Sequence, residues 1–132
     1  MNNTTRYLPF LGRLLIGGIF ILSGAGKLSQ QAGITAAIAH AGLPQPALGY
    51  FVALAVEIGV GLLLALGWRT RAAAAVLAVW CLVTAAFFHN NFADQNTMIH
   101  FLKNVMIAAG LLQIVHFGPG AISLDARLTR SS

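Results

Sequence analysis

Charged residues are scarce in this sequence. Asp, Glu, Lys and Arg together make up 8% of the 132 residues, whereas a typical soluble domain carries about 25%. Hydrophobic residues make up 58%. A soluble fold of this size could not cover its surface with so few charges. The composition therefore excludes an ordinary soluble domain and makes lipid the solvent for much of a single-domain chain.

Acidic residues are the scarcest charged group, with three against eight basic residues and a formal net charge of +5. The basic residues are scattered rather than clustered, which excludes nucleic acid as the partner and fits an anionic membrane surface. The single cysteine, Cys81, rules out an intrachain disulfide and reads as a small packing residue. The sequence also lacks GxGxxG, P-loop, CxxC, HExxH and GxSxG motifs, which argues against a self-contained nucleotide, thiol-redox or hydrolase site.

Four apolar stretches are present, each close to the ~20 residues that cross a bilayer as a helix. They cover residues 7–27, 47–67, 72–89 and 98–117. Because lipid offers the backbone no hydrogen bonds, helices are the expected spanning form. The sequence thus predicts an all-α membrane protein, with residues 1–132 forming one four-transmembrane-helix bundle.

The connection between the first two stretches predicts a fifth, shorter helix. Ile34 and Ile38, with two alanines, recur at i, i+3, i+4 and i+7 on one helical face. Gly42 followed by Pro44 is a helix-stop signal. We expect a short interfacial helix lying on the outer membrane surface, with a plain surface loop as the alternative. The second connection is a tight turn, so spans two and three should be antiparallel neighbours.

The orientation follows from the arginines. Four spans place both termini and the short second connection on one side, where six of the eight basic residues lie: Arg6, Arg13, Arg69, Arg71, Arg127 and Arg130. The opposite side has Lys27 and Lys103. The positive-inside rule then predicts a multi-pass bacterial inner-membrane protein with cytoplasmic N- and C-termini.

Glu57 is the one acidic residue inside a predicted span. It lies ~15 Å below the outer face, between Lys103 at ~8 Å and Arg13 at ~21 Å. An unpaired charge at that depth costs at least ~2.5 kcal/mol. We therefore expect Glu57 to face inward, either bonded to Arg13, Lys103 or both, or protonated. A structural ion pair that sets helix register and a proton- or substrate-handling site both stay open.

Two histidines at similar depth, His89 and His100, form with Lys27 the expected outer rim of this site. A metal site needs three or four converging ligands, so no metal is predicted. The histidines are expected to hydrogen-bond at the interface or to line a cavity, with a haem held between them as a weaker alternative.

Six segments, taken in order, together resemble one family. They are GRLLIGGIFILSGAGKL (Gly12–Leu28), AGLP (Ala41–Pro44), VEIGVGLLLALGWRTR (Val56–Arg71), FFHNNF (Phe87–Phe92), FLKNVMIAAGLL (Phe101–Leu112) and GPGAISLD (Gly118–Asp125). The set resembles the DoxX family of small bacterial membrane proteins and covers most of the chain.

The resemblance implies a four-helix inner-membrane protein. Relatives in the family include the small subunit of a thiosulfate:quinone oxidoreductase and a membrane subunit that gathers redox-stress enzymes. The family's polar pattern maps onto seven positions: Arg13, Lys27, Glu57, His89, Lys103, Asn104 and Asp125. Catalysis does not transfer with the fold, and the absence of a cofactor motif leaves open whether the chain is an enzyme.

The expected site is an outward-opening polar pocket, with Arg13, Glu57, Lys103 and Asn104 at its base. The first hypothesis is a redox-associated accessory subunit that binds a quinone or similar amphiphile non-covalently. The second is a non-enzymatic scaffold that docks partners through its tail or short turn. The third is a small-solute or proton transporter, which would need an oligomer. Expected partners are the bilayer, redox-enzyme subunits and further copies of the chain.

Overall fold

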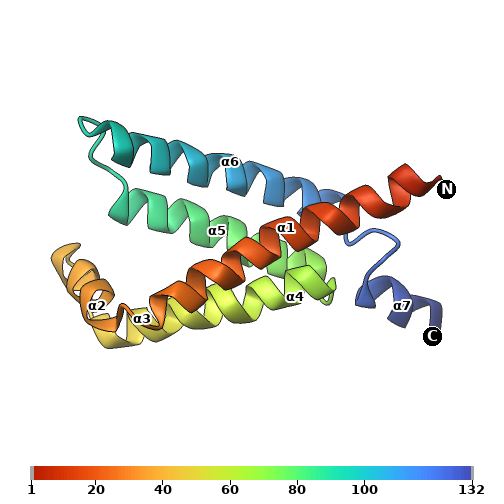
Figure 1. Ribbon diagram of the computed structural model, residues 1–132, viewed down its shortest axis with the longest axis horizontal. Helices are drawn as coiled ribbons and strands as arrows, with labels where there is room; N and C mark the ends of the chain where they lie inside the picture. Colours follow the sequence, from red (N-terminus) through yellow and green to blue (C-terminus); the bar gives the residue numbers. More distant parts are fainter. Residues whose placement is uncertain (1, 132) are drawn as a thin grey trace.

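The computed structural model describes residues 2–131, and every regular element among them is helical. Figure 1 shows the order of the elements: α1 (Asn3–Lys27), α2 (Gln31–His40), α3 (Pro46–Leu54), η1 (Ala55–Val60), α4 (Gly61–Leu66), α5 (Thr70–Phe88), α6 (Gln95–Phe117) and α7 (Leu124–Ser131). The element η1 is a stretch of wider π-helix. It joins α3 and α4 into one continuous second span.

Four helices are long and apolar enough to cross a membrane, which confirms the predicted all-α, four-span class. They are Asn3–Lys27, Pro46–Leu66, Thr70–Phe88 and Gln95–Phe117. The first and the fourth begin several residues earlier than hydropathy predicted because polar residues cap them. The Asn2 side chain accepts a hydrogen bond from the Thr5 amide at 2.9 Å, and the Asp94 side chain accepts one from the Asn96 amide.

The spans form two packed pairs. Helix α1 lies along the second span, α5 pairs with α6, and the second span joins the pairs by contacting α5 (Figure 1). Spans two and three are therefore neighbours, as the tight turn predicted. Leu64, Leu77 and Leu111 are fully buried where these helices meet. Helix α6 packs chiefly against α5 and buries few of its own residues, so most of its surface is open to lipid or to partners.

A glycine contact sets how closely α1 approaches the second span. A Cβ at Gly17 would lie 2.7 Å from the Gly61 carbonyl oxygen and 2.9 Å from the Ala65 amide nitrogen. Small residues let helix backbones approach in lipid, where no hydrophobic force drives helices together. The contact fixes the register between α1 and the second span.

The short helix expected after the first span is present as α2. It ends at His40, and Gly42 follows with a left-handed φ of 82°, as the stop signal predicted. Ile38 is buried against Gly49 of α3. The position of α2 on a membrane surface stays a prediction.

Different elements meet at the two ends of the bundle (Figure 1). The hairpin end comprises the C-terminal end of α1, α2 and the loop that joins α5 to α6. The tail end comprises the start of α1, the turn between α4 and α5, and α7. Which end faces the cytoplasm stays a prediction.

Candidate functional site

Glu57 lies in η1, where the backbone of the second span widens into a π-helix. Such π-turns are rare and often occur at functional sites. Gly24 of α1 faces this turn, because a Cβ there would lie 2.5 Å from Ile58 Cγ1 and 3.2 Å from Glu57 Cβ. Helix α1 can therefore approach the wide turn closely, which buries the glutamate at 4% exposure.

The Glu57 carboxylate is held by two residues of α1. Its Oε1 accepts hydrogen bonds from Ser23 Oγ at 2.5 Å and from Lys27 Nζ at 2.8 Å. Ser23 and Lys27 are four residues apart and so share one helical face. The Tyr50 hydroxyl donates to the Lys27 carbonyl at 2.9 Å and ties α3 to the same place. The Glu57 carboxyl group is thus held by one ammonium and one hydroxyl of the same helix.

The predicted partners of Glu57 were wrong. Arg13 reaches away from the glutamate and donates to the carbonyls of Leu64 and Ala65, both at 3.1 Å, and to that of Ile122. Leu64 lies seven residues beyond Glu57, ~10 Å further along the helix. The last carbonyls of a helix lack partners within it, so they attract a buried guanidinium. The prediction used only the depth of each residue along the helix axis, so it could not account for the attraction between Arg13 and these backbone carbonyls.

The other predicted base residues also lie elsewhere. Lys103 is exposed on α6, which packs on α5 rather than on the second span. The Asn104 side-chain amide lies 3.4 Å from Thr84 Oγ1 and links α6 to α5. Lys27, placed at the rim from its position in the sequence, is the true ion-pair partner because its long stem reaches back from the end of α1. Arg13, Glu57, Lys103 and Asn104 therefore do not form one pocket base.

The histidines of the expected rim do meet. The rings of His89 and His100 lie 5.4 Å apart between centroids, tilted by 32°. The pKa of His89 is below its usual value. Partial burial is the largest cause, and electrostatic repulsion from the nearby His100 and Lys103 lowers this pKa further. In the part of the chain that the structure describes, no three His, Cys, Asp or Glu residues gather as metal ligands would.

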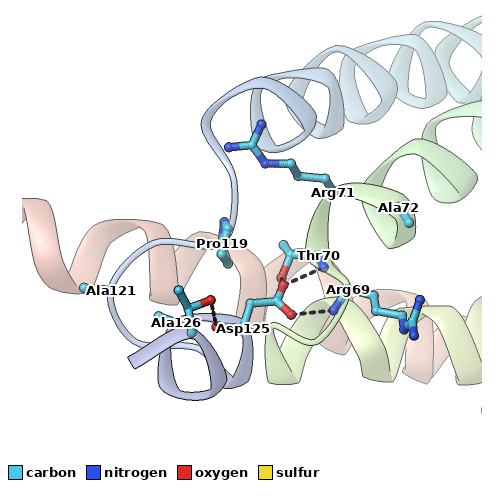
Figure 2. Close-up of a pocket in the computed structure, with 9 residues that line it drawn as sticks. Arg69, Thr70, Arg71, Ala72, Pro119, Ala121, Asp125 and Ala126 are labelled. Carbon is cyan, nitrogen blue, oxygen red and sulfur yellow. Dashed lines mark hydrogen bonds between the residues drawn. The ribbon is translucent and has the colours of Figure 1, made fainter. Parts of the chain in front are cut away.

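A second polar cluster, at the tail end, centres on Asp125. Its carboxylate accepts hydrogen bonds from the Arg69 and Thr70 amides, both at 2.8 Å, and from the Thr70 hydroxyl at 2.7 Å (Figure 2). Helix α5 has no side-chain cap of its own, since the residue at its N-cap is Arg69, whose side chain has no acceptor atom. Asp125 therefore caps α5 from 55 residues away. Spacing gave no sign of this role, and only the family resemblance pointed to Asp125.

Gly67 brings the tail-end cluster together. It has a φ of 74°, and a Cβ there would lie 2.4 Å from Arg13 Nη1 and 2.5 Å from Ser123 Cβ. Its carbonyl accepts the Asp125 amide at 2.9 Å. Only glycine fits this conformation and this space. The turn after α4, the buried Arg13 and the tail are thus interlocked.

A groove of about 790 Å³ runs between the start of α5 and the tail (Figure 2). Its lining includes Arg69, Arg71, Pro119 and Asp125. Arg69 and Arg71 point to opposite sides, so their guanidinium groups do not converge on one ligand (Figure 2).

The Asp125 contacts predict a pH-dependent stability. Partial burial alone would raise the pKa of Asp125, but hydrogen bonds from Thr70 and Arg69, with the charge of Arg13, outweigh it and hold that pKa below its usual value. A depressed carboxyl pKa stabilises the fold above the unfolded pKa of about 3.9, and this contribution is lost as pH falls through the folded pKa. We expect Asp125→Ala to lower the free energy of unfolding at neutral pH by about 1 kcal/mol. The difference should vanish in acid, as measured by thermal unfolding across pH.

The control for this experiment is Asp94→Ala, which removes a capping carboxylate from α6 at the opposite end. Limited proteolysis should cut the tail faster in Asp125→Ala but not in Asp94→Ala. Equal cleavage of the tail in both variants would contradict the conclusion that Asp125 holds the tail against the start of α5.

Comparisons with known proteins agree with this architecture. The DoxX family model matches residues 8–90. The chain is 35% identical to the Escherichia coli inner membrane protein YqjF, over 91% of each chain. It is 34% identical to the Escherichia coli inner membrane protein YphA, over 95% of this chain and 99% of that protein. No solved structure matches the chain significantly.

Proposed function

Since the chain belongs to the DoxX family and is a multi-pass inner-membrane protein, we propose that it is a redox-associated accessory subunit that binds a quinone or similar amphiphile beside the Lys27–Glu57 pair. The proposal rests on the buried Glu57 carboxylate, whose ion-pair partner Lys27 is partly exposed at the surface of the bundle. Glu57 is shielded, whereas the Lys27 side chain is 28% exposed. An amphiphile could therefore reach the pair from the Lys27 side without unfolding the bundle.

The chemistry of the pair suits a quinone head. A quinone carbonyl accepts hydrogen bonds, and the Lys27 ammonium has a third N–H to donate beyond those it gives to Glu57 and Ser23. A quinol hydroxyl releases a proton on oxidation, which the Glu57 carboxylate can accept. Exposed apolar side chains on the same elements, Leu22 and Leu28 on the α1 side and Phe51 on α3, offer a surface for the tail of the amphiphile.

The accessory role rests on what the sequence lacks. The two electrons of a quinol need an acceptor, and the chain carries no motif that would hold its own redox cofactor. The electrons would pass to or from a partner redox enzyme, while this chain would position the head group and exchange its protons.

The test is binding of a short-tailed quinone analogue to the purified protein. Glu57→Gln keeps the shape of the side chain but removes its charge and its ability to take a proton. We expect wild type to be stabilised thermally by the analogue and the variant to bind it about tenfold more weakly, as loss of a charged partner predicts.

Asn104→Ala is the matched control, because Asn104 is a polar residue at the α5–α6 contact rather than at Glu57. It should bind the analogue as wild type does. Equal binding by wild type and Glu57→Gln, or no binding by either, would refute the quinone site.

A non-enzymatic scaffold is the second candidate, favoured by the largely unpacked α6 and by the groove beside the tail. A stable protein partner that co-purifies with wild type and with Glu57→Gln, but not with a chain lacking α7, would support it. Transport and self-association stay sequence hypotheses, with no separate observation in their favour.

A further inference from the structure

Three side chains that can carry positive charge lie together at the hairpin end. His89 ends α5, and its ring meets that of His100 on α6. Lys103 follows His100 by three residues, so it lies on the same face of α6 one turn further on. Its charge is close enough to affect His89. His100 and Lys103 are exposed, while His89 is half-buried.

Over the described part of the chain, each acidic side chain is bonded to groups outside this cluster. There are three in all. Glu57 is bonded to Lys27 and Ser23, and Asp125 caps α5 at the opposite end. Asp94, in the adjoining loop, is bonded to the Asn96 amide and the Thr97 hydroxyl at the start of α6. Within the residues that the structure describes, no ion pair reaches Lys103 or either histidine.

We propose that His89, His100 and Lys103 form a binding site for a phosphate- or sulfate-type oxyanion. An ammonium inside an apolar span is costly without a counter-ion, and among the described residues no acidic side chain forms an ion pair with Lys103. A tetrahedral oxyanion has several acceptor oxygens, which suits an ammonium and two imidazole N–H donors. The oxyanion could come from an anionic lipid head group or from solution.

Binding should be linked to protonation of the histidines. An anion favours the imidazolium form, so it should raise the pKa of His89 and bind more tightly as pH falls. The charged groups facing His89 are His100 and Lys103 from α6. The second span, which also packs on α5, contributes Glu57, which is already paired with Lys27. The site shares no residue with the Lys27–Glu57 pair, so the two proposals fail independently.

The experiment follows the histidine ring protons by NMR during pH titration in detergent. Sulfate and inorganic phosphate are compared with chloride at equal ionic strength. In wild type we expect either oxyanion to raise the pKa of His89. Lys103→Gln should weaken the oxyanion about tenfold, as loss of one charge-assisted hydrogen bond predicts. The control His116→Gln changes a histidine of the tail end and should leave the response unchanged.

A second arm places the protein in nanodiscs of phosphatidylcholine with or without phosphatidylglycerol. A shift of His89 with phosphatidylglycerol alone identifies a lipid head group as the ligand, and a shift with soluble oxyanions identifies a ligand from water. Both results support the site. No shift in either arm, or a shift that survives Lys103→Gln, overturns it. The wild-type titration decides the matter even if the variant fails to fold.

Discussion

Replacing Arg13 with methionine is expected to destabilise the fold more than any other change to a charged residue. Arg13 is 1% exposed and donates to three backbone carbonyls from the second span and the tail. Interhelical hydrogen bonds in membranes average about 0.6 kcal/mol each. The Leu64 carbonyl would keep the Gly67 amide as a donor at 3.1 Å, but a buried carbonyl left without any donor costs about 1–3 kcal/mol. We therefore expect Arg13→Met to lower the free energy of unfolding by about 3 kcal/mol. Thermal unfolding in detergent would measure it.

Arg6→Met is the matched control, because Arg6 is exposed on the same helix and its side chain lies over the Tyr7 ring. It should change the thermal midpoint little. Arg13→Lys should fall between the two, since one ammonium cannot reach carbonyls on two sides as a guanidinium does. A small effect for Arg13→Met would show that the three bonds add nothing to stability.

The second large effect is expected for Gly17→Val. Its Cβ would overlap backbone atoms of Gly61 and Ala65, and backbone cannot move aside as a flexible side chain can. Helix α1 would have to separate from the second span, at a cost of about 3 kcal/mol, the upper end for overpacking. The separation would also draw Lys27 and Ser23 away from Glu57. We expect a lower thermal midpoint together with loss of quinone-analogue binding.

Gly18→Val is the control, because a Cβ at Gly18 meets nothing within 4 Å. It makes the same chemical change one residue along the same helix. Both stability and ligand binding should stay close to wild type. If Gly18→Val were as damaging as Gly17→Val, valine in α1 would be harmful in itself and the close crossing would not explain the result.

Features that depend on nearby residues were predicted well. The four spans, the short α2 and its end before Gly42 follow from hydropathy, from the helical spacing of apolar residues and from the helix-stop signal. Each of these signals is contained in one short segment of the sequence. Span ends were less accurate, because Asn2 and Asp94 extend helices through caps that a hydropathy window does not see. The position of His89 beside His100 also followed, since both lie next to one short loop.

Features that join distant segments were predicted poorly. Depth along the membrane normal made Arg13 and Lys103 equally plausible partners for Glu57. It carried no information about which face of each helix turns toward which neighbour. Asp125 was indicated by resemblance, but its role as the cap of α5 was not.

The sequence by itself determined that this protein is embedded in lipid, crosses it as four helices and has one acidic residue inside a span that needs either a partner or a proton. These three conclusions follow from the free-energy cost of exposing backbone groups and charges to hydrocarbon. Each segment has this cost regardless of how it packs against the others. Only the tertiary structure decided that the partner is Lys27, that Arg13 binds carbonyls and that the tail caps α5. Those outcomes depend on helix rotation and register, which contacts such as Gly17 against Gly61 set between residues far apart in the chain.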